Sequence, residues 1–440
     1  MNWKQLLNAH RLGDPKTTTQ YGARNDYQRD FDRVVFSTPF RRMDGKTQVF
    51  PLPESDTTHN RLTHSLEVSC VGRSLGRIAG ETLVAHGLLP EESSSIVAAA
   101  SLAHDLGNPP FGHSGEAAIA DFFERSKPSE PYLAGLTEDE CADFTRFEGN
   151  ALGFRILART KPLQSDRTGG MQLTLATLGA FSKYPRPSLP MGKNDSASGK
   201  KFGYFQSEKE TFELVANSLG LVVAPDCGWR RHPLAFLMEA ADDICYRILD
   251  LEDGFRLKLV SFERTQELLQ AVADLTPSPT TRKLDRIWDR KEKISYLRAK
   301  AINNLVMQVA EVFVANEDAI LAGEYDKPLL MAAPAYAETE AILTESKQYI
   351  YSHRPVVEIE TAGYRVLGGL LEDFLDAALE FPRSKRSKKV ISLIGPEYLG
   401  EAQDNQYECV MGITEFIASM TDAFAISCYR MLRGIELPTT

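Results

Sequence analysis

SLAHDLGNPPFGH, residues 101–113, carries more information about fold and chemistry than any other segment of the chain. It places His104 and Asp105 side by side at the end of an apolar helical run, residues 93–105, which opens with three serines suited to capping. The Gly-Asn-Pro-Pro that follows ends the helix, because a Pro-Pro pair lacks backbone donors and clashes with the preceding turn. The adjacent imidazole nitrogen and carboxylate oxygen form a mixed donor set that suits a catalytic divalent ion.

A His-Asp dipeptide alone has simpler explanations, since the aspartate could cap a helix or pair with an arginine. Neighbouring residues lie about 100° apart around a helix, so both can face one ion only near an exposed helix end. Two further candidate ligands, His64 and Asp242, lie far away in the sequence. Four ligands from three helices would leave coordination positions for water and a substrate oxygen. Imidazole and carboxylate without thiolate suit Mn, Mg, Fe, Co or Zn.

A second histidine, His113, follows the helix break at a short distance. The glycines and prolines of residues 107–112 bend the chain, so that His113 can return towards the metal. Glu116 lies three residues further on the next helix, within reach of the His113 ring. A histidine positioned by a carboxylate is a typical general acid–base or nucleophile pair. The alternative for His113 is helix capping or core packing.

Composition narrows the class of protein. The chain has 440 residues, 43% hydrophobic and 25% charged, with a net charge of −10. This net negative charge argues against a general nucleic-acid coat protein, because such proteins use an excess of basic residues to neutralise phosphates. The six cysteines contain no Cys-x-x-Cys pair, which disfavours a thiolate zinc site and is typical of buried free thiols. The first residues lack the apolar core of a signal peptide, and no apolar run could cross a bilayer, so we expect a cytoplasmic protein without a membrane partner.

Helical periodicity covers most of the chain and predicts a mainly α fold. The clearest helical segments are residues 64–79, 93–105, 236–251, 295–314 and 407–432. Short strand candidates occur at residues 48–52 and 201–205, and residues 160–170 and 185–201 are expected to be loops. Because the candidate ligands run from His64 to Asp242, this region must fold as one unit.

Several longer strings match one known family. They are RRMDGKTQVF at residues 41–50, RLTHSLEV at 61–68, AHDLGNPPFGH at 103–113 with GEAAI at 115–119, FEGNA at 147–151, KYP at 183–185, ADDI at 241–244 with Tyr246, and SMTD at 419–422. On these strings the chain resembles the deoxyguanosinetriphosphate triphosphohydrolase-like (dGTPase-like) family of HD-domain phosphohydrolases. The matching strings extend from about residue 40 to about residue 430, which is far more specific than a His-Asp pair.

The resemblance implies an HD-domain helical fold elaborated with peripheral helices and at most a few short strands. It implies a single dGTPase-like domain over residues 1–440, with an HD metal-binding core at about 60–255 and a helical C-terminal part at about 256–440. Family members assemble as homo-oligomers, often hexamers, and several respond to nucleotide effectors.

The resemblance also assigns roles to residues. The metal ligands would be His64, His104, Asp105 and Asp242. Asp242 is preferred to Asp243 because a tyrosine and an acid, Tyr246 and Asp250, then follow on the same helix face.

The catalytic histidine and its carboxylate partner in the family correspond to His113 and Glu116. For the sugar, the family's tyrosine corresponds to Tyr246, the acid that binds the 3′-hydroxyl to Asp250, and a further contact to Gln48.

For the phosphates, motif position suggests Arg61 and Lys183, with Tyr184 beside the sugar or phosphate. Arg298 is a further phosphate candidate, proposed only from its place on a helix after Tyr296. Each residue has a plainer alternative. Tyr246 could be core, Arg61 could be an ion-pair partner, and Lys183 could be a solvated loop charge.

The implied reaction is hydrolysis of dGTP or other deoxynucleoside triphosphates (dNTPs) to a deoxynucleoside and inorganic triphosphate. Water, prepared by the metal or by His113, would attack the α-phosphorus. Other HD enzymes hydrolyse phosphomonoesters, cyclic nucleotides or guanosine tetraphosphate, and these activities are alternatives. A nucleotide- or single-stranded-DNA-binding regulator is another alternative, with the basic residues 383–389 as the phosphate contact. Asn108, where many HD enzymes have His, and residues 43–45 depart from the family pattern.

Overall fold

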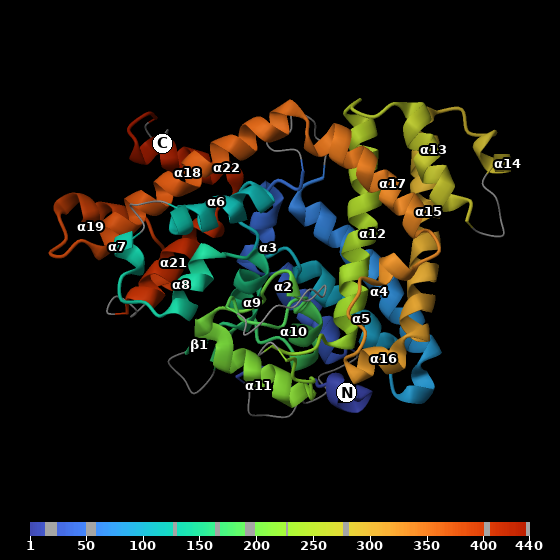
Figure 1. Cartoon of the computed structure of the whole chain (residues 1–440), viewed down its shortest axis with the longest axis horizontal. Helices are drawn as coiled ribbons and strands as arrows, with labels where there is room; N and C mark the ends of the chain where they lie inside the picture. The colour runs from blue at the N-terminus through green and yellow to red at the C-terminus, as the bar shows by residue number, and fades with distance from the viewer. Residues whose placement is uncertain are drawn as a thin grey trace.

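The computed structural model describes residues 1–13, 24–49, 59–125, 130–162, 168–189, 199–225, 228–275, 281–399 and 405–436. Helices dominate these residues, and the prediction of a mainly α fold is confirmed (Figure 1). Two hydrophobic cores hold the helices together, one built mainly from the first three quarters of the chain and one that includes the C-terminal helices.

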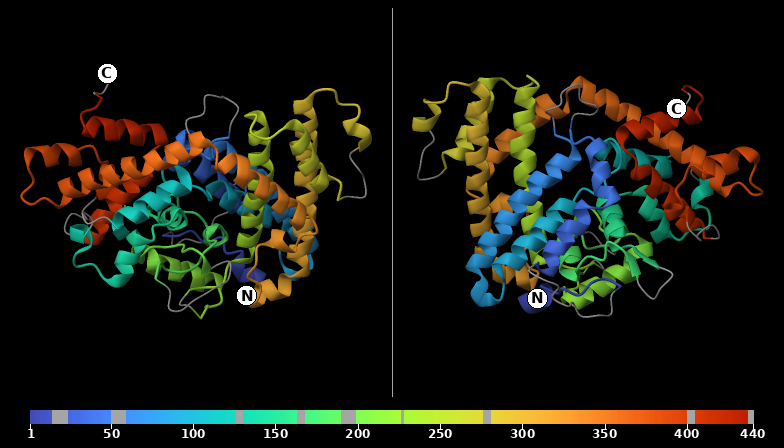
Figure 2. Two further views of the ribbon diagram at one scale, coloured as in Figure 1. Left: turned by 45° about the horizontal axis from the view of Figure 1, so that its top comes forward. Right: turned by 180° about the vertical axis from the view of Figure 1, so that it is seen from behind.

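The first core is centred on two antiparallel neighbours, α4 (Arg61–Thr82) and α5 (Pro90–Ala103). Their backbones approach closely because small residues face each other: a Cβ on Gly76 would lie 2.7 Å from the Ser93 carbonyl oxygen. The helices that pack on this pair are α2 (Asp26–Val35), α10 (Leu175–Phe181), α12 (Pro233–Arg256) and α15 (Arg290–Ala315). The rear view in Figure 2 shows α4 and α5 beside the long helices α12 and α15.

The ends of two helices and the middle of a third determine where the candidate metal ligands lie. α4 begins with a capping box, in which the Asn60 and Thr63 side chains each bind the other residue's backbone. His64 therefore lies in the first turn of α4, whereas His104 is the C-cap residue of α5. Asp242 lies in the middle of α12, which begins at Pro233 in the first helical turn, where a proline is tolerated.

The second core packs around α18 (Arg354–Leu379), a long helix with an apolar stripe that ends in Phe374, Leu375 and Ala378. Its partners are α6 (Gly112–Arg125), α19 (Lys385–Ile391), α21 (Gln406–Ala418) and α22 (Asp422–Leu432). In Figures 1 and 2, α18 crosses the molecule from α19 towards α12 and so bridges the two cores.

The remaining helical segments connect or cover these two cores. They are α1 (Trp3–Leu6), α3 (Thr38–Arg42), α7 (Glu130–Leu133), α8 (Glu138–Thr145), α9 (Gly149–Ala158), α11 (Lys209–Leu219), α13 (Phe262–Ala273), α14 (Thr281–Leu284), α16 (Glu317–Ala322), α17 (Tyr336–Ser346) and α20 (Pro396–Leu399), with 3₁₀ turns at Met43–Gly45, Val84–His86, Gln206–Glu208 and Leu329–Ala332 and a π-helical turn at Lys347–Tyr351.

The short strands are not where the sequence predicts them. The described residues form one antiparallel pair, β1 (Thr160–Pro162) and β2 (Thr168–Gly170), in the segment expected to be a loop. Residue 201 lies in a bend and residues 202–205 have no regular secondary structure. The Gly203 N–H donates to the Arg186 carbonyl oxygen at 3.1 Å. Residues 48–49 form a bend, and residues 50–52 lie outside the described part of the chain.

The sequence also predicts that no segment crosses a membrane and that the cysteines are buried free thiols. Within the described residues, no single helix is long and apolar enough to span a membrane. One pair of helices in the described part of the chain, Gln406–Ala418 with Asp422–Leu432, is long and apolar enough together, but the two are bent by 116°. Of the described cysteines, Cys245, Cys409 and Cys428 are buried free thiols as expected, whereas Cys70 is exposed, because it lies on the outer face of α4.

Candidate metal centre and active-site cavity

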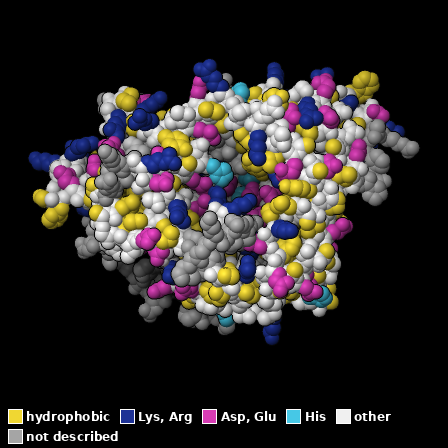
Figure 3. Space-filling view, in the orientation of Figure 1, with side chains coloured by type: hydrophobic (Ala, Val, Ile, Leu, Met, Phe, Trp, Pro, Cys, Tyr) yellow, Lys and Arg dark blue, Asp and Glu magenta, His cyan; other side chains and the backbone are white. Residues whose placement is uncertain are grey.

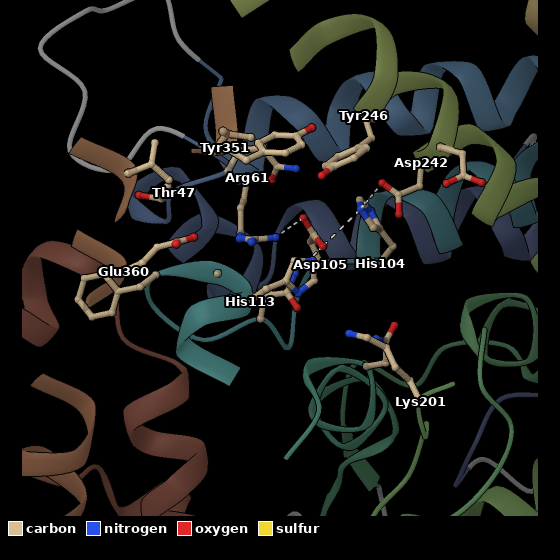
Figure 4. A pocket seen from close by; sticks show the side chains of 18 of the residues that line it. Thr47, Arg61, His104, Asp105, His113, Lys201, Asp242, Tyr246, Tyr351 and Glu360 are labelled. Atoms are coloured by element: carbon tan, nitrogen blue, oxygen red, sulfur yellow. Dashed lines mark hydrogen bonds and ion pairs between the residues drawn. The ribbon is translucent and has the colours of Figure 1, made fainter. Parts of the chain in front are cut away.

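Four side chains from three distant parts of the sequence converge at the floor of a cavity. His64 Nε2 lies 3.2 Å from Asp242 Oδ1, and His104 Nε2 lies 3.4 Å from both Asp105 Oδ1 and Asp242 Oδ1. Candidate ligand atoms of His64, His104 and Asp105 all lie within 4.8 Å of one another, and all three residues are buried. Figure 4 shows the His104, Asp105 and Asp242 side chains pointing at one another.

Neighbouring groups orient these side chains. His104 Nδ1 lies 2.7 Å from the Ser101 carbonyl oxygen, to which it can donate, and this leaves Nε2 to face the cluster. Asp105 is held from two sides, by the Arg61 guanidinium at 2.6 Å and by the Asn108 amide at 2.5 Å. The cluster is therefore preorganised by hydrogen bonds of the chain itself.

The charges of the cluster fit a divalent cation. Burial raises the pKa of Asp105, but the nearby Arg61 and His104 charges outweigh it and hold that pKa well below its usual range. Burial also raises the pKa of Asp242. The charge of Lys183, whose Nζ lies 2.7 Å from Asp242 Oδ2, outweighs burial and keeps that pKa low. Two ionised carboxylates and two imidazoles form a hard and borderline donor set without thiolate, which fits the ions expected from the sequence.

His113 and Glu116 form the predicted pair. His113 Nδ1 lies 2.8 Å from Glu116 Oε2, and the other Glu116 oxygen accepts the Gly149 N–H at 2.9 Å. The His113 side chain is 78% exposed and lines the cavity, whereas Glu116 is buried. Burial raises the pKa of Glu116, but the hydrogen bond with His113 and the Lys201 charge lower it to about 2. Glu116 is thus a fixed anion behind the His113 ring.

The cavity above the cluster has a volume of about 380 Å³ and a mixed polar and apolar wall. In Figure 3 it is the hollow at the centre of the face, with basic, acidic and histidine side chains inside it. Five of the residues predicted to bind substrate line it: Gln48, Arg61, Lys183, Tyr184 and Tyr246. Gln48 Oε1 is buried and has no hydrogen-bond partner among the described residues, so it is an acceptor available for a ligand.

Two predicted substrate contacts do not line the cavity among the described residues. Asp250 is buried behind it and accepts a hydrogen bond from the Tyr351 hydroxyl at 2.6 Å. Arg298 is not placed as the sequence suggests, because its guanidinium is bound to Glu252 of α12 at 2.7 and 3.0 Å. The structure therefore gives no support to Arg298 as a phosphate contact.

The sequence interpretation missed Tyr351, Lys201 and Glu360, which all line the cavity. The Tyr351 ring stacks on Tyr246 with 5.6 Å between ring centroids, and Glu360 comes from the first turns of α18. Lys201 Nζ lies 2.7 Å from Glu148 and 3.5 Å from Glu116. No local pattern marks these residues, although Lys201 ends the basic segment 185–201 that the sequence singled out as a loop.

A helical cleft with paired imidazoles and carboxylates at its floor, backed by a His-Glu pair, defines an HD-domain phosphohydrolase. The family model of the HD domain matches residues 61–146, which include three of the four clustered side chains.

Comparison with known proteins places the chain more narrowly. It is 43% identical over 448 residues to a deoxyguanosinetriphosphate triphosphohydrolase-like protein of Synechocystis, with 99% of this chain and 100% of that protein covered. It is 38% identical to a protein of the same name from Pseudomonas aeruginosa, with both chains covered completely. A deoxyguanosinetriphosphate triphosphohydrolase of Klebsiella pneumoniae is 30% identical, with 99% of this chain and 98% of that protein covered. The chain belongs to the dGTPase-like family of HD-domain hydrolases.

Proposed function

We propose that the protein is a metal-dependent triphosphohydrolase that converts dGTP or other dNTPs into a deoxynucleoside and inorganic triphosphate. The observation that carries this proposal is a cluster of buried His64, His104 and Asp105 with half-buried Asp242. It shares one cavity with three cationic side chains, Arg61, Lys183 and Lys201. The relatives named as deoxyguanosinetriphosphate triphosphohydrolases support the choice of substrate class.

The cavity offers separate places for sugar and phosphates. Lys183 and Lys201 would receive the triphosphate, and Arg61, which now binds Asp105, would face the same phosphates. The exposed face of Tyr246 would pack on the deoxyribose, and the unpaired Gln48 oxygen would accept its hydroxyl. Asp250 would also bind the sugar hydroxyl after its hydrogen bond with the Tyr351 hydroxyl has broken.

His64, His104, Asp105 and Asp242 would hold the divalent ion. When bound, such an ion neutralises charge on the α-phosphoryl group and lowers the pKa of water.

His113 would act on the other side of the phosphorus. Its Nε2 would take the proton of the attacking water, since Nδ1 is engaged with Glu116. Glu116 would stabilise the resulting imidazolium, because it remains an anion above a pKa of about 2. The bond from α-phosphorus to the 5′-oxygen would break, the 5′-oxygen would take up a proton, and inorganic triphosphate would leave.

We also propose that residues 1–440 work as one dGTPase-like domain, because the cavity takes its lining from both proposed parts. Arg61 and Tyr246 precede residue 256, whereas Tyr351 and Glu360 follow it. Assembly into a homo-oligomer and activation by a nucleotide or by single-stranded DNA stay predictions.

The decisive experiment incubates the Mn²⁺-loaded protein with each dNTP, singly and in mixtures, and separates the products by anion-exchange chromatography. Inorganic triphosphate and deoxynucleoside in equal amounts are expected, and mixtures would reveal activation of one hydrolysis by another nucleotide. Orthophosphate or pyrophosphate as the product would contradict the proposal and favour another HD phosphohydrolase activity. The Asp105→Ala variant serves as the inactive control.

A further inference from the structure

Two buried charged residues outside the proposed catalytic set, Lys46 and Asp422, connect the C-terminal helices to the metal-binding loop. Lys46 is 3% exposed and Asp422 is 1% exposed, although both types of side chain are normally at the surface. A buried charge is costly unless its hydrogen bonds are satisfied, so the partners of these two groups indicate what they hold in place.

Lys46 binds the loop after the His-Asp pair. Its Nζ donates to the Asn108 carbonyl oxygen at 2.6 Å and to the Ala418 carbonyl oxygen, at the end of α21, at 2.8 Å. The Asn108 amide in turn donates to Asp105 at 2.5 Å. Lys46 therefore fixes the residue that orients a proposed metal ligand, and it does so against the second core.

Asp422 binds two segments with one carboxylate. Its Oδ2 accepts the Thr47 N–H at 3.0 Å and also the Thr47 hydroxyl, and its Oδ1 accepts the Phe111 N–H at 3.1 Å. Thr47 precedes Gln48 on the sugar side of the cavity, and Phe111 lies two residues before His113. The carboxylate thus sets the spacing between these two walls.

The segment that carries Lys46 and Thr47 is also fixed to the start of α4. The Arg61 N–H donates to the Lys46 carbonyl oxygen at 3.1 Å, and Thr47 pairs with Asn60 in an isolated β-bridge. Displacement of this segment would therefore also move the helix end from which Arg61 and His64 project.

We infer that Lys46 and Asp422 are positioning residues for the reaction, through which the C-terminal segment 418–422 sets the geometry between the sugar-binding wall and the loop of Asp105 and His113. The inference rests on the proposed function, because it assigns these walls to sugar and phosphorus. A displacement of about 1 Å at reacting atoms can reduce the rate about 10²-fold, so small shifts of either wall would be visible in kcat.

The first test uses Asp422→Asn and the milder Thr47→Val, which removes only the hydroxyl donor to Asp422. Each should lower kcat for dNTP hydrolysis about 10–100-fold in protein that remains folded. Thr47→Ser keeps the hydroxyl that donates to Asp422, so its kcat should stay close to that of the parent protein. The matched controls are Asp30→Asn and Thr177→Val, since Asp30 is also fully buried and accepts a threonine N–H at 3.0 Å and the Thr177 hydroxyl at 2.8 Å, away from the cavity. These controls should lower the melting temperature but leave kcat per folded molecule within twofold.

The second test measures Mn²⁺ affinity by titration calorimetry without substrate. Lys46→Met should weaken Mn²⁺ binding about 10–100-fold, because it frees Asn108 and thereby Asp105. Asp422→Asn should weaken Mn²⁺ binding less than Lys46→Met does, because Asp422 contacts Thr47 and Phe111 rather than Asn108, the residue that orients Asp105.

The two tests can fail independently. Unchanged kcat in Thr47→Val and Asp422→Asn, or an equal loss in the Asp30 control, would overturn the role of Asp422. Unchanged Mn²⁺ affinity in Lys46→Met would overturn the role of Lys46. If the parent protein released no triphosphate from any dNTP, the proposed function would fail, while the Mn²⁺ titration would still decide on Lys46.

Discussion

At the scale of single residues, the two histidines of the HD stretch differ in surroundings. His104 is buried, with Nδ1 on the Ser101 carbonyl oxygen and Nε2 towards the acids. His113 is exposed to the cavity and bound to one glutamate. The first arrangement suits a metal ligand, and the second suits a group that exchanges a proton with substrate or water.

This difference predicts opposite metal contents for two inactive variants. His104→Ala should lose turnover more than about 10³-fold together with most bound Mn²⁺, because one ligand is gone. His113→Ala should lose turnover about 10²–10⁴-fold yet keep Mn²⁺. Elemental analysis after gel filtration, alongside kcat, checks both. His86→Ala is the control, because His86 is an exposed histidine paired with Glu317. If His113→Ala retained its turnover, His113 would have no part in the mechanism.

Glu148 provides a prediction for pH dependence. Burial and the negative charge of Glu116 raise the pKa of Glu148 to about 7, against the partial compensation by Lys201. This pKa lies above that of a glutamate in the unfolded chain. The free energy of unfolding that Glu148 contributes is therefore lost progressively as the pH rises from about 4.5 to about 7. Glu148→Gln should therefore stabilise the protein more at pH 8 than at pH 5, by on the order of 1 kcal/mol. Melting temperatures at both pH values, with the exposed Glu81→Gln as control, test this; an equal shift at both would contradict it.

At the scale of elements, the loop after α5 is set by its contact with α9. A Cβ on Gly107 would lie 2.0 Å from the Gly149 carbonyl oxygen and 2.2 Å from the Gly153 nitrogen, both in the α9 backbone. Backbone atoms within a packed core cannot move aside cheaply. The loop that carries Asp105 and Asn108 can therefore approach α9 only with glycine at this position.

Gly107→Ala should destabilise the protein by about 3 kcal/mol, because α9 and the loop must separate. Gly368→Ala is the matched control within α18, where the nearest atom to an added Cβ is 3.8 Å away. It should stabilise by about 0.5–1 kcal/mol, since alanine is the better helix former. Urea unfolding curves compare the two variants, and similar midpoints would show that the contact with α9 does not limit this position.

At the scale of the whole molecule, the N-terminal two thirds and the C-terminal helices are joined by buried charges. Arg155 of α9 binds Glu415 at 3.0 Å and Glu408 at 3.1 Å, both on α21, and Glu208 at 2.6 Å. One guanidinium thus holds three carboxylates near the boundary of the second core.

Arg155→Met should destabilise the fold by about 3 kcal/mol, because Glu208 and Glu408 lose the cation that they share and Glu415 is left with Arg159. Arg125→Met removes an arginine that is 74% exposed and paired with Asp121, so a change below about 1 kcal/mol is expected. Equilibrium unfolding in guanidinium chloride would measure both. Equal losses would mean that the α9–α21 network contributes no more than a surface pair.

From the sequence alone a mainly α fold could be predicted, and the structure confirms it. The sequence also proposes His64, His104, Asp105 and Asp242 as metal ligands, and the pair His113 and Glu116, three residues apart on one helix. Those predictions depend on helical periodicity, on the proline break and on family strings, which are local in the chain. The tertiary structure decided the partners of Arg298, the stacking of Tyr351 on Tyr246, and the connection of Lys46 and Asp422 to the metal-binding loop. Such contacts join residues up to 375 positions apart, and no local pattern encodes which of many buried polar groups will meet when two cores pack together.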